Sequence, residues 1–212
     1  MSVVIVDTSC ANLSSVKFAI ERLGVNPVIS ADASVIAAAE RVILPGVGTA
    51  KAAMRNLQQL DLVTTLRQLQ QPVLGICLGM QLLTESSEEG NVDCLGVIPT
   101  RTIAMQTTDP QQQGQPLLYP LPHMGWNTIE VNPANPLLKN LRDPAYCYFV
   151  HSFAVATDRY TLATTRYGNT SFASMIGHGN FFGAQFHPER SGKVGATILK
   201  NFMELTDADT RA

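Results

Sequence analysis

The chain has 212 residues and a net charge of −2; 45% of its residues are hydrophobic and 15% are charged. This is the profile of a soluble globular protein with a well-buried core, and it gives no reason to expect nucleic acid or an anionic membrane as a partner. Cysteines at positions 10, 77, 94 and 147 lie far apart and form no C-x-x-C pair, which predicts free thiols in a reducing cytoplasm.

The chain starts with MSVVIVD, a short apolar run with no basic region before it, which Asp7 ends. This pattern predicts a first strand rather than a signal peptide. No apolar run approaches the roughly 18 residues of a membrane-spanning helix.

The first 85 residues alternate short apolar runs with amphipathic ones. Strands are expected at VVIVD, NPVIS, RVILPG and PVLGI. Helices are expected where Leu13, Val16, Ile20 and Leu23 share one face, over about 49–69 in one or two pieces, and directly after Cys77. Strands that are apolar on both faces and separated by helices predict a parallel sheet covered on both sides.

The second half changes character. Residues 105–122 are rich in Gln and Pro and are expected to form a loop, while YCYFVHSFAV, YTLATTRYG, SFASMIGHG and NFFGAQFHPE predict antiparallel or mixed strands added to the parallel core. A last helix follows. The prediction is a three-layer α/β fold with a mostly parallel central sheet flanked by helices, one domain over 1–206 and a flexible tail at 207–212.

The segment GICLG places Cys77 between two glycines, after an apolar strand and before a helix. The spacing has the form of the G-x-S-x-G nucleophile elbow, whose sharp turn leaves no room for a Cβ at the glycines. A helix start favours the thiolate, the nucleophilic form of cysteine. The alternative is a buried thiol that packs as a small hydrophobic group beside a turn.

A cysteine nucleophile needs a base, and the chain has four histidines. His123 and His178 lie in turn-like contexts and are expected in surface loops, whereas His151 is expected in the core. His187 ends an apolar strand in QFHPE, with Glu189 two residues later. In extended chain these two side chains project to one face, and the intervening proline disfavours helix. His187 is therefore the candidate base and Glu189 its orienting carboxylate, unless Glu189 is merely solvated.

The segment PGVG at 45–48 follows the third strand. It is expected at the same edge of the sheet as the two candidate catalytic groups, because the carboxyl ends of parallel strands meet there. The N–H groups of Val47, Gly48 and Leu78 are candidates for an oxyanion hole. A phosphate-binding loop is a rival, but its sequence patterns are absent, and an ordinary turn remains the other alternative.

In this order and spacing, PGVG, GICLGMQLL and QFHPE resemble the motifs of the class I (triad-type) glutamine amidotransferases over nearly the whole chain. LPGVGTA, PLPHMGWN, FVHSF and QFHPERSG are similar to the branch that serves histidine biosynthesis. The resemblance implies that Cys77 attacks the side-chain amide of glutamine, that His187 protonates the leaving ammonia and that Glu189 orients His187. It implies neither a cofactor nor a metal. The implied substrate contacts are Gly46, Gln81, Ser152 and Phe153.

The resemblance also implies a heterodimer with a (β/α)8-barrel cyclase that receives the ammonia. Trp126, the only tryptophan, is expected in a glycine-containing loop and is either a core residue or an interface anchor. Asn12 matches a family position near the same interface. The segment DTSCANL departs from the family pattern DYG-x-GNL, which leaves the conformation of residues 9–11 open.

Three rival interpretations stay open. The first is another Cys-His hydrolase on a similar elbow, the second is a non-catalytic regulatory or scaffold subunit of the same shape, and the third is a glutaminase for another pathway. The first needs neither Gln81 nor the H-P-E spacing. The second would be marked by the loss of a triad member, and none is missing.

Overall fold

The protein is described here from a computed structural model, which covers residues 1–9, 12–106, 119–132, 134–206 and 208–209. Most of the predicted loop at 105–122, most of the predicted tail at 207–212, and Cys10 and Ala11 lie outside the described residues. The single-domain boundary at 206 stays a prediction.

Parallel strands form one half of the central sheet, in the spatial order β2–β1–β3–β4–β13. These strands are β1 (Val3–Val6), β2 (Val28–Ser30), β3 (Arg41–Gly46), β4 (Val73–Cys77) and β13 (Phe181–Ala184). β1 shows why the runs are apolar throughout: alternate residues enter two different core clusters, one on each face.

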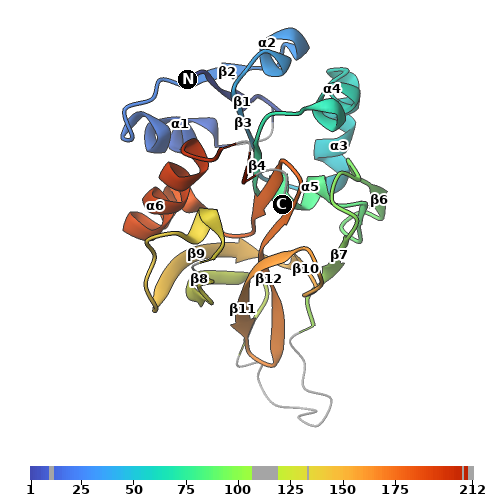
Figure 1. Ribbon diagram of the computed structural model, residues 1–212. Helices are drawn as coiled ribbons and strands as arrows, with labels where there is room; N and C mark the ends of the chain where they lie inside the picture. The colour runs from blue at the N-terminus through green and yellow to red at the C-terminus, as the bar shows by residue number, and fades with distance from the viewer. Residues whose placement is uncertain (10–11, 107–118, 133, 207, 210–212) are drawn as a thin grey trace.

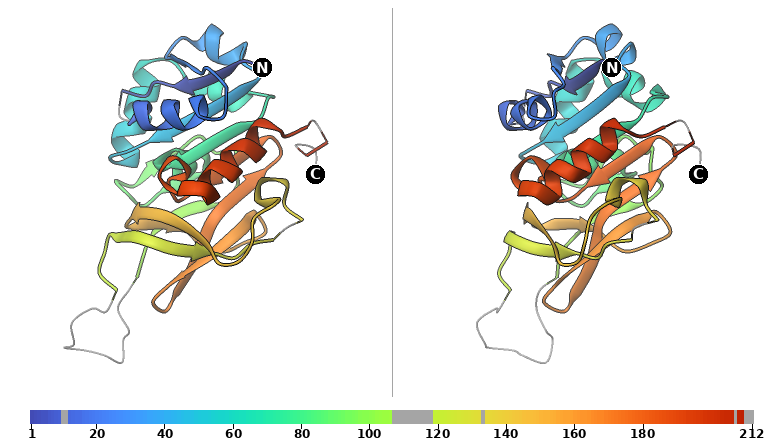
Figure 2. Two further views of the ribbon diagram at one scale, coloured as in Figure 1. Left: turned by 90° about the vertical axis from the view of Figure 1, so that its left-hand side faces the viewer. Right: turned by 60° about the vertical axis from the view of Figure 1, so that its left-hand side comes forward.

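Helices cover both faces of this sheet (Figures 1 and 2). The buried side chains of α1 (Leu13–Glu21) and α6 (Gly192–Met203) join one core cluster. The opposite cluster takes its helical residues from α2 (Ala33–Ala37), α3 (Ala50–Gln59), α4 (Val63–Gln68) and α5 (Leu78–Leu83). The long helical segment expected at 49–69 is thus two helices, separated where Asp61 adopts a positive φ of 54°.

Strands from residue 86 onward extend the sheet, and their pairings with one another within it are all antiparallel except that of β5 with β7. Beyond β13 the order continues β12–β10–β7–β5–β6, with β11 pairing β12, to give an 11-stranded sheet among the described residues. The bounds are β12 (Thr170–His178), β10 (Phe153–Val155), β7 (Arg101–Ala104), β5 (Ser86–Ser87), β6 (Val92–Asp93) and β11 (Thr161–Tyr167). β8 (His123–Ile129) and β9 (Ala145–His151) form a separate two-stranded sheet, and the 3-10 turns are η1 (Pro136–Leu138) and η2 (Pro188–Arg190).

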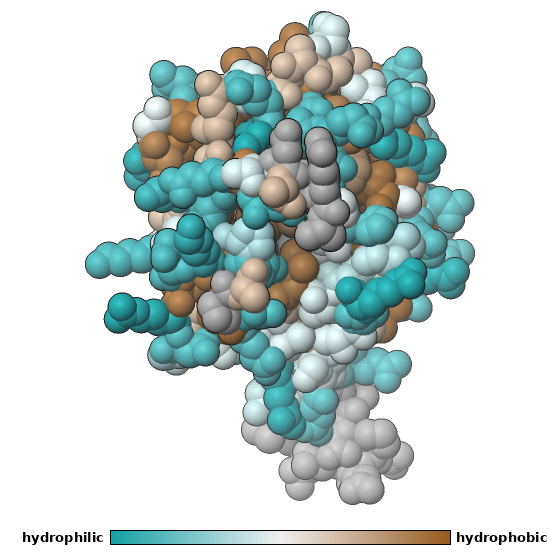
Figure 3. Space-filling view, in the orientation of Figure 1, coloured by the Kyte–Doolittle hydropathy of each residue, from teal (hydrophilic) through white to brown (hydrophobic). Residues whose placement is uncertain are grey.

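The expected three-layer α/β fold is confirmed, with one change of place. β13, expected among the antiparallel or mixed additions, is mixed: it pairs β4 in parallel, with Ala184 opposite Ile76, and so joins the parallel core, while it pairs β12 antiparallel. All four of its residues are buried, which is the pattern of a central parallel strand. Hydrophilic residues predominate on the face in Figure 3. None of the described helices has the length and apolar character needed to span a membrane.

Candidate active site

Cys77 lies on a sharp turn between β4 and α5. Its φ of 53° and ψ of −111° are strained for a residue with a side chain. A Cβ on Gly75 would come within 2.6 Å of the Gly79 carbonyl oxygen, and one on Gly79 within 1.8 Å of the Leu44 carbonyl oxygen. The two glycines of GICLG are therefore required for space, as the elbow pattern predicts.

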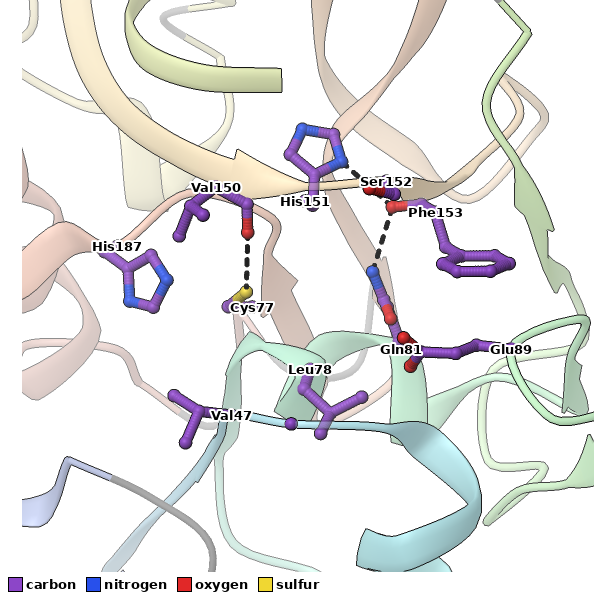
Figure 4. Close-up of a pocket in the computed structure, with 11 residues that line it drawn as sticks. Val47, Cys77, Leu78, Gln81, Glu89, Val150, His151, Ser152, Phe153 and His187 are labelled. Atoms are coloured by element: carbon purple, nitrogen blue, oxygen red, sulfur yellow. Dashed lines mark hydrogen bonds between the residues drawn. The ribbon is translucent and has the colours of Figure 1, made fainter. Parts of the chain in front are cut away.

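Three chain segments meet beside this turn, because β3, β4 and β13 end at one edge of the sheet. Gly46 pairs with Cys77 in register, and β13 leads through residues 185–186 to His187. They border a cavity of about 270 Å³ (Figure 4). It is lined by Val47, Gly48, Cys77, Leu78, Gln81, Glu89, Val150, His151, Ser152, Phe153 and His187.

His187 and Glu189 form a buried pair, with 2.8 Å between His187 Nδ1 and Glu189 Oε1. The expected contact between the two side chains is present, but the backbone conformation differs from the expected one. Residues 188–190 form a 3-10 turn rather than an extended segment. The φ fixed by proline suits the first residue of such a turn, where no N–H is needed. This turn places the Glu189 carboxylate against the His187 imidazole.

The environment of His187 favours the imidazolium. Burial opposes the charge, but the nearby Cys77 sulfur and the Glu189 carboxylate outweigh it and raise the pKa of His187 to about 10. His187 Nε2 is buried and, among the described residues, has no partner that meets hydrogen-bond geometry. The imidazole lies beside Cys77 at the cavity wall (Figure 4), so Nε2 is available to a leaving group or water.

The sulfur of Cys77 has two further neighbours. The thiol donates to the Val150 carbonyl oxygen at 3.8 Å, and the Gln185 amide nitrogen donates to the sulfur at 3.9 Å. Gln185 was not singled out from the sequence, although it stands in the same QFHPE motif as His187.

The candidate oxyanion residues Val47, Gly48 and Leu78 all line the cavity. Gly48 has a φ of +93° with open space around its Cβ position, so conformation rather than space requires glycine there. Gly46, expected to contact substrate, does not line this cavity. Its Cβ position meets the Gly79 nitrogen at 2.9 Å, so its observed role is close packing against α5.

The residues expected to contact substrate are held in place by hydrogen bonds. Gln81 is buried, and its Nε2 donates to the Phe153 carbonyl oxygen and to Gln185 Oε1, both at 3.0 Å. The Phe153 oxygen also accepts from His151 Nδ1, and the Ser152 oxygen accepts from the Met105 N–H. The side-chain oxygen of Gln81 is thus the atom that remains to accept a hydrogen bond from a ligand.

Glu89 lines the cavity beside Gln81 and was missed by the sequence analysis (Figure 4). Its Oε2 accepts from the Ala50 N–H at the start of α3, which holds the side chain in place. The turn SSEEGN carries two adjacent acids and no periodic pattern, so nothing in it distinguishes Glu89 from Glu88. The described residues contain no group of His, Cys, Asp and Glu that could hold a metal ion.

Two of the remaining histidines differ from expectation. His151 is buried, as expected; His178 is exposed but is the last residue of strand β12 rather than part of a loop, and His123 is buried in β8 at 2% exposure rather than in a surface loop. Its Nδ1 lies 3.0 Å from His151 Nε2, and its ring stacks on Phe149 and Tyr167. Burial lowers the pKa of His123 to about 4 and that of His151 to about 3. Both are therefore neutral at pH 7.

The other cysteines are chemically quiet. Cys94 and Cys147 are free and buried, and burial raises the pKa of each to about 12. Both fit the expected structural thiols.

Trp126 is 57% exposed on β8, which is a strand rather than a loop, so it is not a core residue. It packs edge-on against Tyr148, over which the Arg190 guanidinium lies. Arg190 and Asn12 line a second cavity whose wall also includes His187 and Glu189.

A family model described as "Glutamine amidotransferase class-I" matches residues 5–205. This chain belongs to the class I glutamine amidotransferase family. Among curated relatives of this amidotransferase, an imidazole glycerol phosphate synthase subunit HisH from Idiomarina loihiensis is 62% identical, over 97% of this chain and 99% of the relative. The subunit of the same name from Photorhabdus laumondii is 52% identical, over 97% of this chain and 100% of the relative.

Solved structures support the fold of this amidotransferase. One described as a glutamine amidotransferase superposes with a TM-score of 0.68 at 17% identity, over 95% of this chain and 97% of that one. PurLQS from Thermotoga maritima superposes with a TM-score of 0.66 at 18% identity, over 96% of this chain and 97% of the other.

Proposed function

We infer that this chain is the glutaminase subunit of an imidazole glycerol phosphate synthase, which hydrolyses glutamine and supplies ammonia to a cyclase subunit in histidine biosynthesis. Relatives of that name are 50–62% identical over nearly their whole length. The observation that carries the chemistry is that Cys77 and His187 line one cavity, while Glu189 is hydrogen-bonded to His187 from behind it.

The reaction follows from the charges at this site. With His187 as imidazolium, Cys77 attacks the side-chain carbonyl carbon of glutamine as the thiolate. The oxygen of the tetrahedral intermediate takes the negative charge and is held by the N–H groups of Val47, Gly48 and Leu78. The C–N bond breaks as His187 gives its proton to the leaving nitrogen, which departs as ammonia and leaves a glutamyl thioester.

Hydrolysis of the thioester uses the same groups in reverse. Neutral His187 takes a proton from water, the hydroxide adds to the thioester carbonyl, and the C–S bond breaks to release glutamate and the Cys77 thiolate. Glu189 keeps the imidazole oriented in both steps. The Gln81 oxygen and the Glu89 carboxylate hold the α-ammonium group of the substrate, with backbone groups of Ser152 and Phe153 completing the wall.

The second cavity offers ammonia a way toward a partner. It shares Val47, Val150 and His187 with the first cavity and reaches Asn12 and Arg190. Arg190 leads over Tyr148 to the exposed Trp126. We assign the surface around Asn12 and Trp126 to the (β/α)8-barrel cyclase, because a half-exposed tryptophan is a typical interface anchor.

Replacing the nucleophile in the complex with the cyclase subunit tests this function. Cys77→Ala is expected to abolish glutamine-dependent synthesis, while high external ammonium still supports the cyclase reaction. Cys94→Ala, the same change at a buried thiol away from the cavity, is the control. A full glutamine-dependent rate in Cys77→Ala would refute the assignment. Glutaminase turnover unaffected by the partner and its bound substrate would favour a free-standing hydrolase.

A further inference from the structure

Gln185 connects the reacting sulfur of Cys77 with the buried side chain of Gln81. It has no exposed surface and lies one residue beyond the end of β13. Its Nε2 donates to the sulfur of Cys77 at 3.9 Å, and its Oε1 accepts from Gln81 Nε2 at 3.0 Å. Among the described residues, the sulfur is the acceptor found for this Nε2, so a buried amide donor is directed at the reacting atom.

The orientation of the Gln185 amide follows from its neighbours. The Phe153 carbonyl oxygen can only accept, so Gln81 must present its nitrogen to it. The same nitrogen then donates to Gln185, which must present its oxygen in return. The nitrogen of Gln185 is therefore the atom that faces Cys77, and reversing the amide would place two donors, the nitrogens of Gln81 and Gln185, against each other.

The histidine pair supplies the second donor to the Phe153 carbonyl oxygen. Asn127 Nδ2 lies 3.3 Å from His123 Nε2, and His123 Nδ1 lies 3.0 Å from His151 Nε2. With both rings neutral and Asn127 as the donor, His123 donates to His151, and His151 Nδ1 donates to the Phe153 oxygen at 2.9 Å. One consistent set of hydrogen bonds thus fills the Phe153 oxygen.

We propose that Gln185 is a further catalytic residue, whose amide N–H stabilises the Cys77 thiolate before attack and again when the thioester breaks. This role rests on the proposed glutaminase function for its place in the reaction. The Val150 oxygen accepts a hydrogen bond from the neutral thiol, and loses it when the sulfur ionises. Gln185 is then the neutral donor that remains on the sulfur, complementing the charged His187.

If Gln185 stabilises the thiolate, removing its N–H lowers the reactivity of the Cys77 sulfur, whereas a residue that only packs would leave that reactivity unchanged. Gln185→Met keeps the length and removes the donor, so alkylation of Cys77 by iodoacetamide at pH 7 should slow about tenfold or more, because hydrogen bonds to charged groups are the strong ones. Mass spectrometry of the modified peptide separates Cys77 from the other thiols. In the complex with the cyclase subunit, kcat for glutamine should fall by a similar factor with ammonium-dependent synthesis unchanged.

Two further variants keep the test decisive. Asn201→Leu removes another buried amide, which donates to the Leu137 and Lys139 carbonyl oxygens, and serves as the stability-matched control with wild-type alkylation. Gln185→Glu keeps the shape and the bond to Gln81 but turns an oxygen toward the sulfur. Its alkylation deficit should be larger at pH 8, where the carboxylate repels the thiolate, than at pH 6, where the acid form can donate.

Wild-type alkylation rates in folded Gln185→Met would overturn the proposal, as would a Gln185→Glu deficit that does not change with pH. If Gln185→Met does not fold, Gln185→Glu alone decides. Alkylation requires no glutamine and no partner. A failure of the wild-type complex to use glutamine would therefore count against the proposed function, while the alkylation rates would still judge Gln185.

Discussion

The two sides of the active-site cavity are held in place by different means. On one side, β3, β4 and α5 pack backbone against backbone, and Gly46, Gly75 and Gly79 leave no space for a Cβ. On the other side, buried polar side chains hold one another through hydrogen bonds, as His187 does with Glu189 and Gln185 with Gln81. The glycine-packed side should therefore be disrupted by substitutions that add volume. The hydrogen-bonded side should be disrupted by substitutions that remove a donor or turn an acceptor into its place.

Adding one methyl group to the packed side should have the largest effect. A Cβ on Gly79 would lie 1.8 Å from the Leu44 carbonyl oxygen, and backbone cannot move aside cheaply. Gly79→Ala is expected to lower the free energy of unfolding by about 3 kcal/mol or more, measured by urea denaturation.

Gly24→Ala is the control for this change, since Gly24 has a positive φ of 82° and open space around its Cβ position. It should cost about 1 kcal/mol from conformation alone. Equal losses in the two variants would show that conformation, not close packing, makes glycine necessary at the elbow.

Removing the carboxylate from the bonded side should mainly affect the chemistry. Glu189→Gln keeps the shape but loses the part of the attraction that Glu189 adds to that of Cys77 in raising the pKa of His187. We expect kcat for glutamine to fall about 10²-fold, in the range of general acid–base catalysis, with ammonium-dependent synthesis of the complex unchanged. Glu204→Gln, at an exposed pair with Lys200, is the control. Wild-type kcat in Glu189→Gln would remove Glu189 from the mechanism.

Breaking the histidine pair should destabilise this side less than the elbow change. His151→Phe leaves the His123 Nδ1–H without its acceptor and removes one donor from the Phe153 oxygen. The expected loss is about 1–3 kcal/mol of unfolding free energy, whereas His178→Phe, at an exposed histidine, should be near neutral. A neutral His151→Phe would show that the pair does not support the wall.

The bonded side should also give stability a pH dependence. His123 and His151 have pKa values of about 4 and about 3 in the folded protein against 6.5 in the unfolded chain. Between about pH 4 and 6.5 the unfolded chain binds more protons at these two positions, so their contribution lowers stability as the pH falls, by up to about 1.4 kcal/mol per pH unit for each histidine.

The contribution of His187 to stability depends on pH in the opposite direction. Its folded pKa of about 10 lies above 6.5, so its contribution is complete below pH 6.5 and is lost as the pH rises toward 10. Denaturant unfolding of wild type and Glu189→Gln between pH 4 and 10 checks both limbs. A smaller alkaline limb is expected in Glu189→Gln, where Cys77 alone still raises the pKa of His187, and an unchanged alkaline limb would contradict the pairing.

The same contrast explains what the sequence could predict. Cys77 and its glycines are local in the chain, so one segment encodes the whole elbow. The His187–Glu189 contact was also found locally, although the 3-10 turn that makes it was not. Gln185 and Glu89 became visible only in the fold, because their partners Gln81 and Ala50 are distant in sequence.

The fold follows the same rule. The four strands of the first 85 residues were predicted because their runs are apolar, whereas helix α2 and the short strands β5, β6 and β7 were not predicted. β13 was misplaced because a short apolar run does not reveal its neighbours, and His123 was misplaced because its partners, His151 and Tyr167, come from other strands.

Labelling with a glutamine-like electrophile, a diazoketone analogue of glutamine, tests the central assignment most directly. Mass spectrometry of the complex with its cyclase partner is expected to find one label per chain, on Cys77, with glutamine protecting it and with Cys94 and Cys147 unmodified. A label on any other residue, or labelling of Cys77 that glutamine does not slow, would contradict the account.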